Sequence, residues 1–371
     1  MSLDPSFSRN RYSTTIANGY PVQTSNTFAV SLDASWEIDL FGRVRRLNEA
    51  ARNDVEASAA TFESVRLALT SDVATTYFAL RATDHEIEIV NGGVDLRQKE
   101  LKLISNQRKH GAAADFDVSR AETELADTQA EVAALKIRRS SLQNSLAVLV
   151  GEAAPAFDLA TADVSADLAP IPAGLPSDLL ERRPDVAAAE RTLAAANARI
   201  GVAKAAFFPA ISLTGSAGYA SESIDHLFKA DSRQWSIGPS LYLPIFQGGR
   251  NRAALERSRA VFDESVAAYR QQLLTAFREV QDALTATRLL ADQAEAQDRA
   301  VAAARRSNSL AQKRYDAGYV AFFEVIDAQR VVLANERSAV QLAAQRLTTR
   351  VALITALGGG WKSPELVASN P

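Results

Sequence analysis

The sequence feature that most constrains this chain is a repeat with a period of 207 residues. Gly111 and Gly318 each follow a long helical pattern, and another helical pattern begins within a few residues of each glycine. Glycine readily adopts the left-handed backbone conformation in which many helices end. We therefore predict that one helical hairpin occurs twice, with its tips at Gly111 and Gly318. The same period relates three further pairs: Arg43 and Arg250, Val73 and Val280, Gly151 and Gly358.

Apolar residues between these landmarks recur at spacings of three and four, the periodicity of a helix with one apolar stripe. One such stripe is formed by Phe62, Val65, Leu69, Val73, Thr76 and Leu80. Because no proline interrupts residues 43–110, we expect a rod of ~100 Å at about 1.5 Å per residue. Its weak point is Gly92-Gly93, where we expect a tolerated kink or a functional hinge. Helices are predicted at 43–110, 114–150, 185–207, 250–315 and 322–357.

A period of two residues marks the predicted strands. Over residues 28–40, apolar side chains alternate with small or acidic ones, so one face of the strand is apolar and the other is polar. The same alternation occurs at 211–219 and 235–243, which a polar loop separates. Residues 11–17 are a fourth candidate strand, and the turn signal Asn18-Gly19-Tyr20-Pro21 follows them.

Prolines and glycines divide the chain into segments. Residues 151–184 carry five prolines and little periodicity beyond a short helix signal at 177–181, so we interpret them as a connector between two copies. The helix at 185–207 has no counterpart in the first copy, and we therefore expect the chain to begin within a repeat. The predicted organisation is strands at 1–42, a hairpin at 43–150, the connector at 151–184, a helix at 185–208, strands at 209–246, a hairpin at 247–358 and a tail at 359–371.

Composition argues against several classes of function. The net charge of −3, without a basic block, argues against nucleic-acid binding. The absence of cysteine excludes a thiol nucleophile, a disulfide and a thiolate metal site within this sequence. His85, His110 and His226 are scattered, and no Ser–His–acid set or phosphate loop stands out. We therefore predict no enzymatic activity, no metal and no cofactor.

The strands and helices together indicate a membrane-embedded oligomer. No signal-peptide pattern and no run of ~20 apolar residues is present, but strands of about ten residues are near the ~9–11 needed to cross a bilayer. An open four-stranded sheet is not stable in lipid, because each unpaired backbone group costs several kcal/mol there. Three chains would close a 12-stranded barrel, and the helices would continue its wall as an α-barrel tunnel. The alternative is a soluble, elongated coiled-coil scaffold.

Five motifs resemble those of one family of outer-membrane proteins. They are SWEIDLFGR at 35–43, LLERRPDV at 179–186, AFFP at 206–209, the second tip from Arg314-Tyr315 through Gly318 to Asp327-Ala328-Gln329, and ALGGGW at 356–361. Together they resemble the TolC/OprM-type outer membrane factors, specifically the NodT-like lipoprotein subgroup. The resemblance covers nearly the whole chain from about residue 27.

The resemblance implies a mainly α-helical homotrimer with a 12-stranded barrel in the outer membrane of a Gram-negative bacterium and a periplasmic helical tunnel. The implied function is a passive exit duct for small molecules in a tripartite efflux pump. Its implied partners are a periplasmic adaptor, an inner-membrane RND-type transporter and outer-membrane lipid. A signal peptide, a lipidated cysteine and two further helices are expected upstream. A type I secretion duct for proteins is the alternative.

In this family the tips close the periplasmic end of the tunnel, so the resemblance also assigns gate residues. The matching positions are Asp117 in the first tip and Tyr315, Phe323, Glu324 and Asp327 in the second. A ring of carboxylates near a three-fold axis would attract cations, and a ring of Phe323 side chains would form an apolar constriction. The alternative for Asp115 and Asp117 is that they cap the returning helix, and for Asp115 we favour the cap.

Basic and aromatic residues complete the candidate sites. Arg108, Lys109, Lys313 and Arg314 precede the tips, where they either complement the negative ends of the helix dipoles or contact the adaptor. The predicted adaptor-contact residues are Arg108, Gly111, Arg314 and Gly318. Trp36 and Trp235 are candidate membrane-interface aromatics, with ordinary packing as the alternative.

Overall fold

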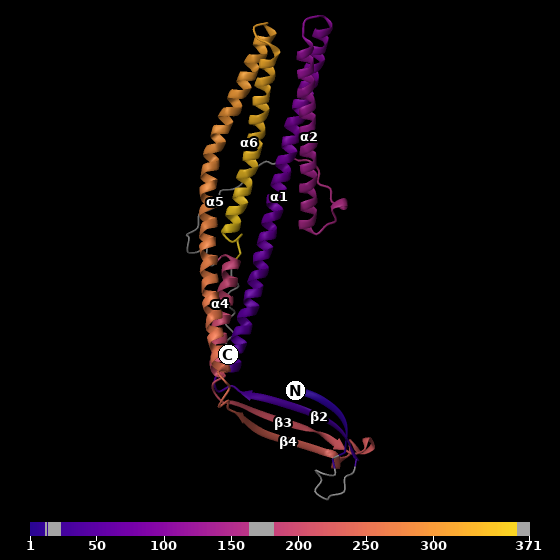
Figure 1. Ribbon diagram of the computed structural model, residues 1–371, viewed down its shortest axis with the longest axis vertical. Coiled ribbons are helices and arrows are strands. Elements are labelled where there is room, and N and C mark those ends of the chain that lie inside the picture. The colour runs from indigo at the N-terminus through magenta and orange to yellow at the C-terminus, as the bar shows by residue number, and fades with distance from the viewer. Residues whose placement is uncertain (12, 14–23, 163–181, 362–371) are drawn as a thin grey trace. The chain divides into compact units, whose positions relative to one another are not determined.

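The computed structural model describes residues 1–11, 13, 24–162 and 182–361 (Figure 1). Its helices are α1 (Arg43–Lys109), α2 (Asp115–Val150), α4 (Pro184–Ala205), α5 (Arg250–Asp316) and α6 (Phe322–Ala356), and its short 3-10 helices are η1 (Ala154–Ala156), η2 (Ile224–His226) and η3 (Ala230–Ser232). Its strands are β1 (Ser2–Arg11), β2 (Thr24–Ile38), β3 (Ala210–Ser221) and β4 (Arg233–Tyr242). The chain forms two compact units. The sheet unit comprises Met1–Ala57 and Ala189–Tyr269, and the hairpin unit comprises Ser58–Ala188 and Arg270–Pro371.

The four strands of the sheet unit form one antiparallel sheet in the order β1-β2-β3-β4. Their register joins apolar residues into rows across all four strands, one of which contains Leu3, Leu32, Ala217 and Trp235. The next row, on the opposite face, contains Ser2, Asp33, Ser216 and Ser236. Because side chains alternate between the faces of a strand, the sheet has one apolar and one polar face. The predicted two-faced strands are confirmed.

The structure contains a first strand that was not predicted, because β1 spans Ser2–Arg11 and pairs with β2. The predicted strand at 11–17 lies, apart from residues 11 and 13, outside the described residues. Within β1, Leu3, Pro5 and Phe7 alternate with polar residues, and this short alternation was the missed signal. Proline is tolerated because β1 lies at the edge of the sheet. The turn signal at 18–21 lies outside the described residues.

The helices confirm the predicted boundaries within about two residues, as their caps and prolines suggested. In Figure 1, α1 with α2 and α5 with α6 form two antiparallel hairpins. Gly92 and Gly93 both lie inside α1. A Cβ on Gly93 would lie 3.1 Å from the Arg97 guanidinium and 3.8 Å from Leu333 of α6, so glycine allows close packing there. Within the described residues, none of the helices combines the length and the apolar character required to cross a bilayer.

Backbone conformation repeats with the predicted period. Positive φ angles occur at Gly42, Gly111 and Gly151 (80°, 76° and 79°), and again 207 residues later at Gly249, Gly318 and Gly358 (83°, 75° and 89°). The hydrogen bond from the Arg46 amide to the Gly42 carbonyl recurs between Ala253 and Gly249. The repeat predicted from residue types is therefore also a repeat of helix starts and ends.

Arg183, in the motif at 179–186, links three helices of the hairpin unit. Its side chain is 8% exposed and donates to both carboxylate oxygens of Asp185 at 3.1 and 2.7 Å. It also donates to the carbonyl of Ala356 at 3.1 Å, at the end of α6, and pairs with Glu279 of α5 at 2.8 Å. The motif thus joins the start of α4 to the neighbouring helices.

Only part of the predicted connector is described. After Gly151 the chain forms η1, and residues 157–160 then contact α1 and α2 through hydrogen bonds. Residues 163–181, which include the predicted short helix at 177–181 and the first part of the motif at 179–186, lie outside the described residues. The tail beyond residue 361 does so too.

Candidate functional site

The two helical tips have the same backbone structure. In the first, the Gly111 amide donates to the Arg108 carbonyl at 3.0 Å and the Ala112 amide to the Gln107 carbonyl at 2.8 Å. In the second, the Gly318 amide donates to the Tyr315 carbonyl at 2.8 Å and the Tyr319 amide to the Arg314 carbonyl at 2.9 Å. This paired pattern around a left-handed glycine is a Schellman motif, which satisfies the last carbonyls of a helix. Both predicted turns are confirmed.

In the first tip, the two aspartates have different partners. Arg108 donates two hydrogen bonds to the Asp115 carboxylate, at 2.6 and 2.8 Å, and this ion pair lowers the pKa of Asp115. The Asp117 carboxylate accepts a hydrogen bond from the Ala114 amide at 3.2 Å and so caps α2. The predicted cap by Asp115 is corrected, because its carboxylate binds Arg108. The Arg108 side chain therefore crosses the tip, from the end of α1 to Asp115 at the start of α2.

In the second tip, one of two consecutive phenylalanines is buried and the other is exposed. Phe322 is 8% exposed and packs with Ile104, Val325 and Ile326, whereas Phe323 is 49% exposed. The Tyr315 ring lies 5.3 Å from the Phe322 ring, and its hydroxyl donates to Gln107 of the first hairpin at 3.2 Å. Tyr315 therefore links the two hairpins within one chain.

Three predicted gate residues lie together on the second hairpin. Phe323, Glu324 and Asp327 line a shallow groove between α5 and α6, and Arg314 completes the rim with its guanidinium 3.7 Å from Glu324. Asp117 belongs to the first tip and does not line this groove. The sequence analysis missed Arg120 of α2, whose guanidinium lies 5.8 Å from the centre of the Phe323 ring. This cation–π contact connects the first hairpin to the groove.

Behind the tips, ion pairs between charged side chains join the two hairpins. Arg330 of α6 binds Glu124 of α2, and Arg337 binds Glu131. Burial raises the pKa of Glu100, an effect that its hydrogen bond with Gln329 only partly offsets. These pairs join positions about 200 residues apart, so periodicity within one helix gave no signal of them.

Trp36 and Trp235 lie on the same, apolar face of the sheet and are 64% and 78% exposed. Through the strand register, Trp235 is in the row of Leu32, four residues along β2 from Trp36. Four residues span about 13 Å along a strand, at about 3.3 Å each. This spacing is smaller than the ~30 Å thickness of the hydrocarbon core. The membrane-interface role of both indoles stays a prediction.

The described residues contain no group of three or more His, Cys, Asp or Glu side chains arranged to hold a metal ion. The site is therefore characterised by its ion pairs and its exposed aromatic and acidic side chains.

Comparison with known proteins agrees with this geometry. The chain matches the family described as "Outer membrane efflux protein" over residues 2–152 and 175–359. It is 38% identical over 335 residues to the solvent efflux pump outer membrane protein SrpC of Pseudomonas putida, covering 90% of this chain and 71% of SrpC.

Two solved structures have the same fold. A membrane protein from Pseudomonas aeruginosa aligns with a TM-score of 0.90 at 36% identity, covering 100% of this chain and 84% of that one. The Campylobacter jejuni CmeC outer membrane channel aligns with a TM-score of 0.88 at 26% identity, covering 98% and 79%. The chain therefore belongs to the outer membrane efflux protein family, and its function is that of an outer-membrane efflux channel.

Proposed function

We propose that this chain forms, as a homotrimer, the passive exit duct of a tripartite efflux pump. Each subunit would contribute four strands to a 12-stranded barrel and two helical hairpins to a periplasmic tunnel. The observation that carries the proposal is the apolar face that runs across all four strands, with Trp235, Ile237 and Leu241 at least 66% exposed. A trimer would turn this face to lipid and pair the edge strands β1 and β4.

The partners proposed for this duct are a periplasmic adaptor and an inner-membrane RND-type transporter. A passive duct needs both, because a barrel and a tunnel by themselves supply no energy for export. The proposed location is the outer membrane, with a periplasmic extension. Any lipid anchor on a cysteine would lie outside these 371 residues, which contain no cysteine.

We assign the gate to the groove of Phe323, Glu324 and Asp327, together with Asp117 and Tyr315 near the two turns. Three copies of the groove around an axis would bring six carboxylates close together, which favours cation entry and opposes a fully closed ring. Phe323 would supply the apolar part of the constriction. The Arg120 contact with Phe323 supports this assignment, because it gives the ring a defined position that movement of a hairpin would change.

Adaptor contact is assigned to the turns themselves, at Arg108, Gly111, Arg314 and Gly318. All four residues are exposed. Both turns present the same backbone, so an adaptor hairpin could contact either tip in the same way. Small-molecule cargo is favoured over protein cargo, since the similar SrpC is described as a solvent efflux protein.

A pair of neighbouring substitutions tests membrane insertion. Ile237 is on the apolar face, and Ser236 is on the polar face in the row of Asp33. A lysine on a lipid-facing position costs about 2–4 kcal/mol near the bilayer midplane. We expect Ile237→Lys to abolish recovery of trimer from the outer-membrane fraction and Ser236→Lys to retain it.

Native mass spectrometry in detergent and single-channel conductance provide the two measurements. Trimer mass and conducting pores from the parent chain support the proposal. A parent chain that stays soluble and monodisperse without detergent, or an Ile237→Lys variant that inserts as well as Ser236→Lys, would contradict it.

A further inference from the structure

The charged residues of the four described strands are sorted by sign between the two faces of the sheet. All the acidic ones lie on the polar face: Asp4, Asp33 and Glu37. All the basic ones lie on the apolar face: Arg9, Arg11 and Arg233. We call these three arginines the basic rim. The alternation of a two-faced strand does not require basic residues on its apolar face, so their presence there needs a separate explanation.

The basic rim lies at the end of the sheet away from the start of α1. Through the register, Arg233 is in the row of Val30, and Arg9 is in the row of Asn26. Near α1 the apolar face ends at Ile38, which lies eight residues along β2 from Val30 and twelve from Asn26. At about 3.3 Å per residue and a strand tilt of about 40°, these separations span roughly 20 and 30 Å across a bilayer. The apolar band of an outer-membrane barrel is about 25 Å tall, so the rim lies at the outer edge of such a band.

Aromatic rings accompany the basic rim on the same face. The rings of Phe7 and Phe28 lie 4.7 Å apart, in a row that the rim encloses. In the loop between β3 and β4, Phe228 is 70% exposed, and its ring lies 5.5 Å from the ring of Tyr219. Tyr219 is the register partner of Arg233. Because aromatic rings are enriched at the depth of lipid headgroups, these neighbours place the rim at the boundary between hydrocarbon and water.

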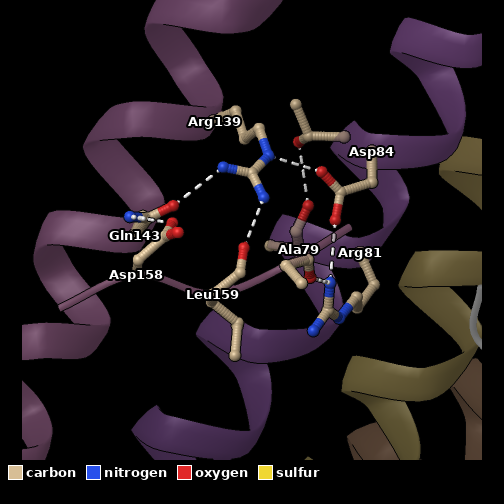
Figure 2. Close-up of polar contacts among 9 residues, drawn as sticks. Ala79, Arg81, Asp84, Arg139, Gln143, Asp158 and Leu159 are labelled. Atoms are coloured by element: carbon tan, nitrogen blue, oxygen red, sulfur yellow. Dashed lines mark hydrogen bonds and ion pairs between the residues drawn. The ribbon is translucent and has the colours of Figure 1, made fainter. Parts of the chain in front are cut away.

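The rim arginines differ from other arginines of the chain in having no carboxylate partner among the described residues. Arg43, at the end of the sheet next to α1, binds the Glu37 carboxylate, and the buried Arg81 of the hairpin unit binds Asp84 (Figure 2). The rim arginines are exposed, and no described acid pairs with them, including those of the β3–β4 loop at 222, 225 and 231. A guanidinium group binds phosphate oxygens through two parallel hydrogen bonds, so an external phosphate is a fitting partner.

The rim residues lie on the two edge strands of the sheet, Arg9 and Arg11 on β1 and Arg233 on β4. Within one chain, three strand spacings of about 4.8 Å separate the edges by about 14 Å. In the homotrimer proposed above, β4 of one copy pairs with β1 of the next, which brings all three guanidinium groups to one subunit junction. The cluster is therefore complete only between two copies, and a trimer contains three of them.

We propose that the basic rim binds the phosphate groups of a membrane lipid at each of these junctions. The proposal rests on the trimeric barrel of the proposed function, which turns the apolar face to lipid and places the rim in the outer leaflet. A phosphate monoester carries a charge of about −1.5 to −2 at pH 7. A lipid with two such groups, the chemistry of lipid A, therefore matches three guanidinium groups better than a phosphodiester lipid with a single charge. Its acyl chains lie along the exposed Trp235 and Ile237.

Native mass spectrometry of the detergent-solubilised trimer, with lipid A added, tests this binding. We expect the parent trimer to bind up to three molecules of lipid A and to bind lipid A without its phosphates much more weakly. The triple variant Arg9→Gln, Arg11→Gln, Arg233→Gln should bind lipid A about tenfold more weakly or worse than the parent, because hydrogen bonds between charged groups are the stronger ones.

A matched control removes the same number of positive charges elsewhere in the sheet unit. The triple variant Arg52→Gln, Arg257→Gln, Arg259→Gln changes exposed arginines of α1 and α5 and should bind lipid A as the parent does. Single-channel conductance shows whether each variant still forms a pore, which separates lost lipid binding from lost assembly. The comparison of lipid A with its dephosphorylated form uses the parent chain and needs no variant.

Equal binding of both forms of lipid A to the parent trimer would overturn the proposal. Unchanged binding of lipid A to the rim variant, or an equal loss in the control variant, would do the same. Phosphatidylglycerol that binds as tightly as lipid A would overturn the assignment to a headgroup with two phosphates. A parent chain that forms no trimer would overturn the proposed function and the junction site together, whereas a conducting trimer without a preference for phosphate overturns the junction site alone.

Discussion

Replacing Arg183 by methionine should be among the most damaging single changes to the hairpin unit. The guanidinium makes hydrogen bonds or ion pairs with Asp185, Glu279 and the Ala356 carbonyl, and only 8% of the side chain is exposed. Breaking a buried ion pair by removing one partner costs about 3–5 kcal/mol. Because Glu279 is 41% exposed and can be solvated, we expect the lower end, about 3 kcal/mol.

The same cluster makes stability depend on pH. Burial acts to raise the pKa of Asp185, but the hydrogen bond and charge of Arg183 outweigh it, so the pKa is lowered from 3.8. A carboxylate with a lowered folded-state pKa contributes stability that is present above 3.8 and lost as pH falls through the folded-state value. In Arg183→Met this pH-dependent contribution should shrink, since only the hydrogen bonds from the Val186 amide and Gln272 then oppose the effect of burial on the pKa of Asp185.

Urea unfolding of the detergent-solubilised protein, followed by circular dichroism, measures both effects. Arg182→Met is the control, because Arg182 is exposed and adjacent in sequence. The double variant Arg183→Met, Asp185→Asn should recover part of the loss, since it removes the buried charge left behind. A loss below about 1 kcal/mol for Arg183→Met, or an equal loss for Arg182→Met, would refute the reasoning.

Three further predictions concern Gly358, Gly218 and Glu100. Gly358→Ala should lower the unfolding temperature more than Gly151→Ala. Both glycines have a positive φ, which costs about 1–2 kcal/mol for other residues. Of the two, only Gly358 would place an added Cβ in overlap with a carbonyl oxygen. Gly218→Ala should disrupt the pairing of β2 with β3, because the added Cβ would overlap the backbone of β2. Gly215→Ala should be tolerated, because the atom nearest to its added Cβ lies 3.8 Å away. Recovery of trimer distinguishes the two variants. Glu100→Gln should stabilise the protein at pH 7, because the raised pKa of Glu100 means that its ionised carboxylate destabilises the fold. This penalty is relieved as the pH falls and the carboxylate becomes protonated. A stabilisation by Glu100→Gln that persists at pH 4 would contradict this explanation.

The candidate gate shows where prediction from sequence was limited. The resemblance placed Phe323, Glu324 and Asp327 at the second tip, and the structure brings all three to one groove. It did not distinguish the roles of Asp115 and Asp117, because either carboxylate can cap a helix from the first turn. The position of Arg108 separates the two roles. Arg108, seven residues away across the turn, binds Asp115 and leaves Asp117 to cap α2.

The repeat, the helix ends and the two faces of the strands could be predicted from the residues alone. These properties are local, since a spacing of two or of three and four defines a face, and a left-handed turn selects glycine at Gly111 and Gly318. Three features could be learned only from the folded chain: the order of the strands, the burial of Phe322 beside an exposed Phe323, and the ion pairs of Glu124 and Arg183. The physical reason is that periodicity indicates which residues share a face of one element. The residue on the facing element, often far away along the chain, is set by packing.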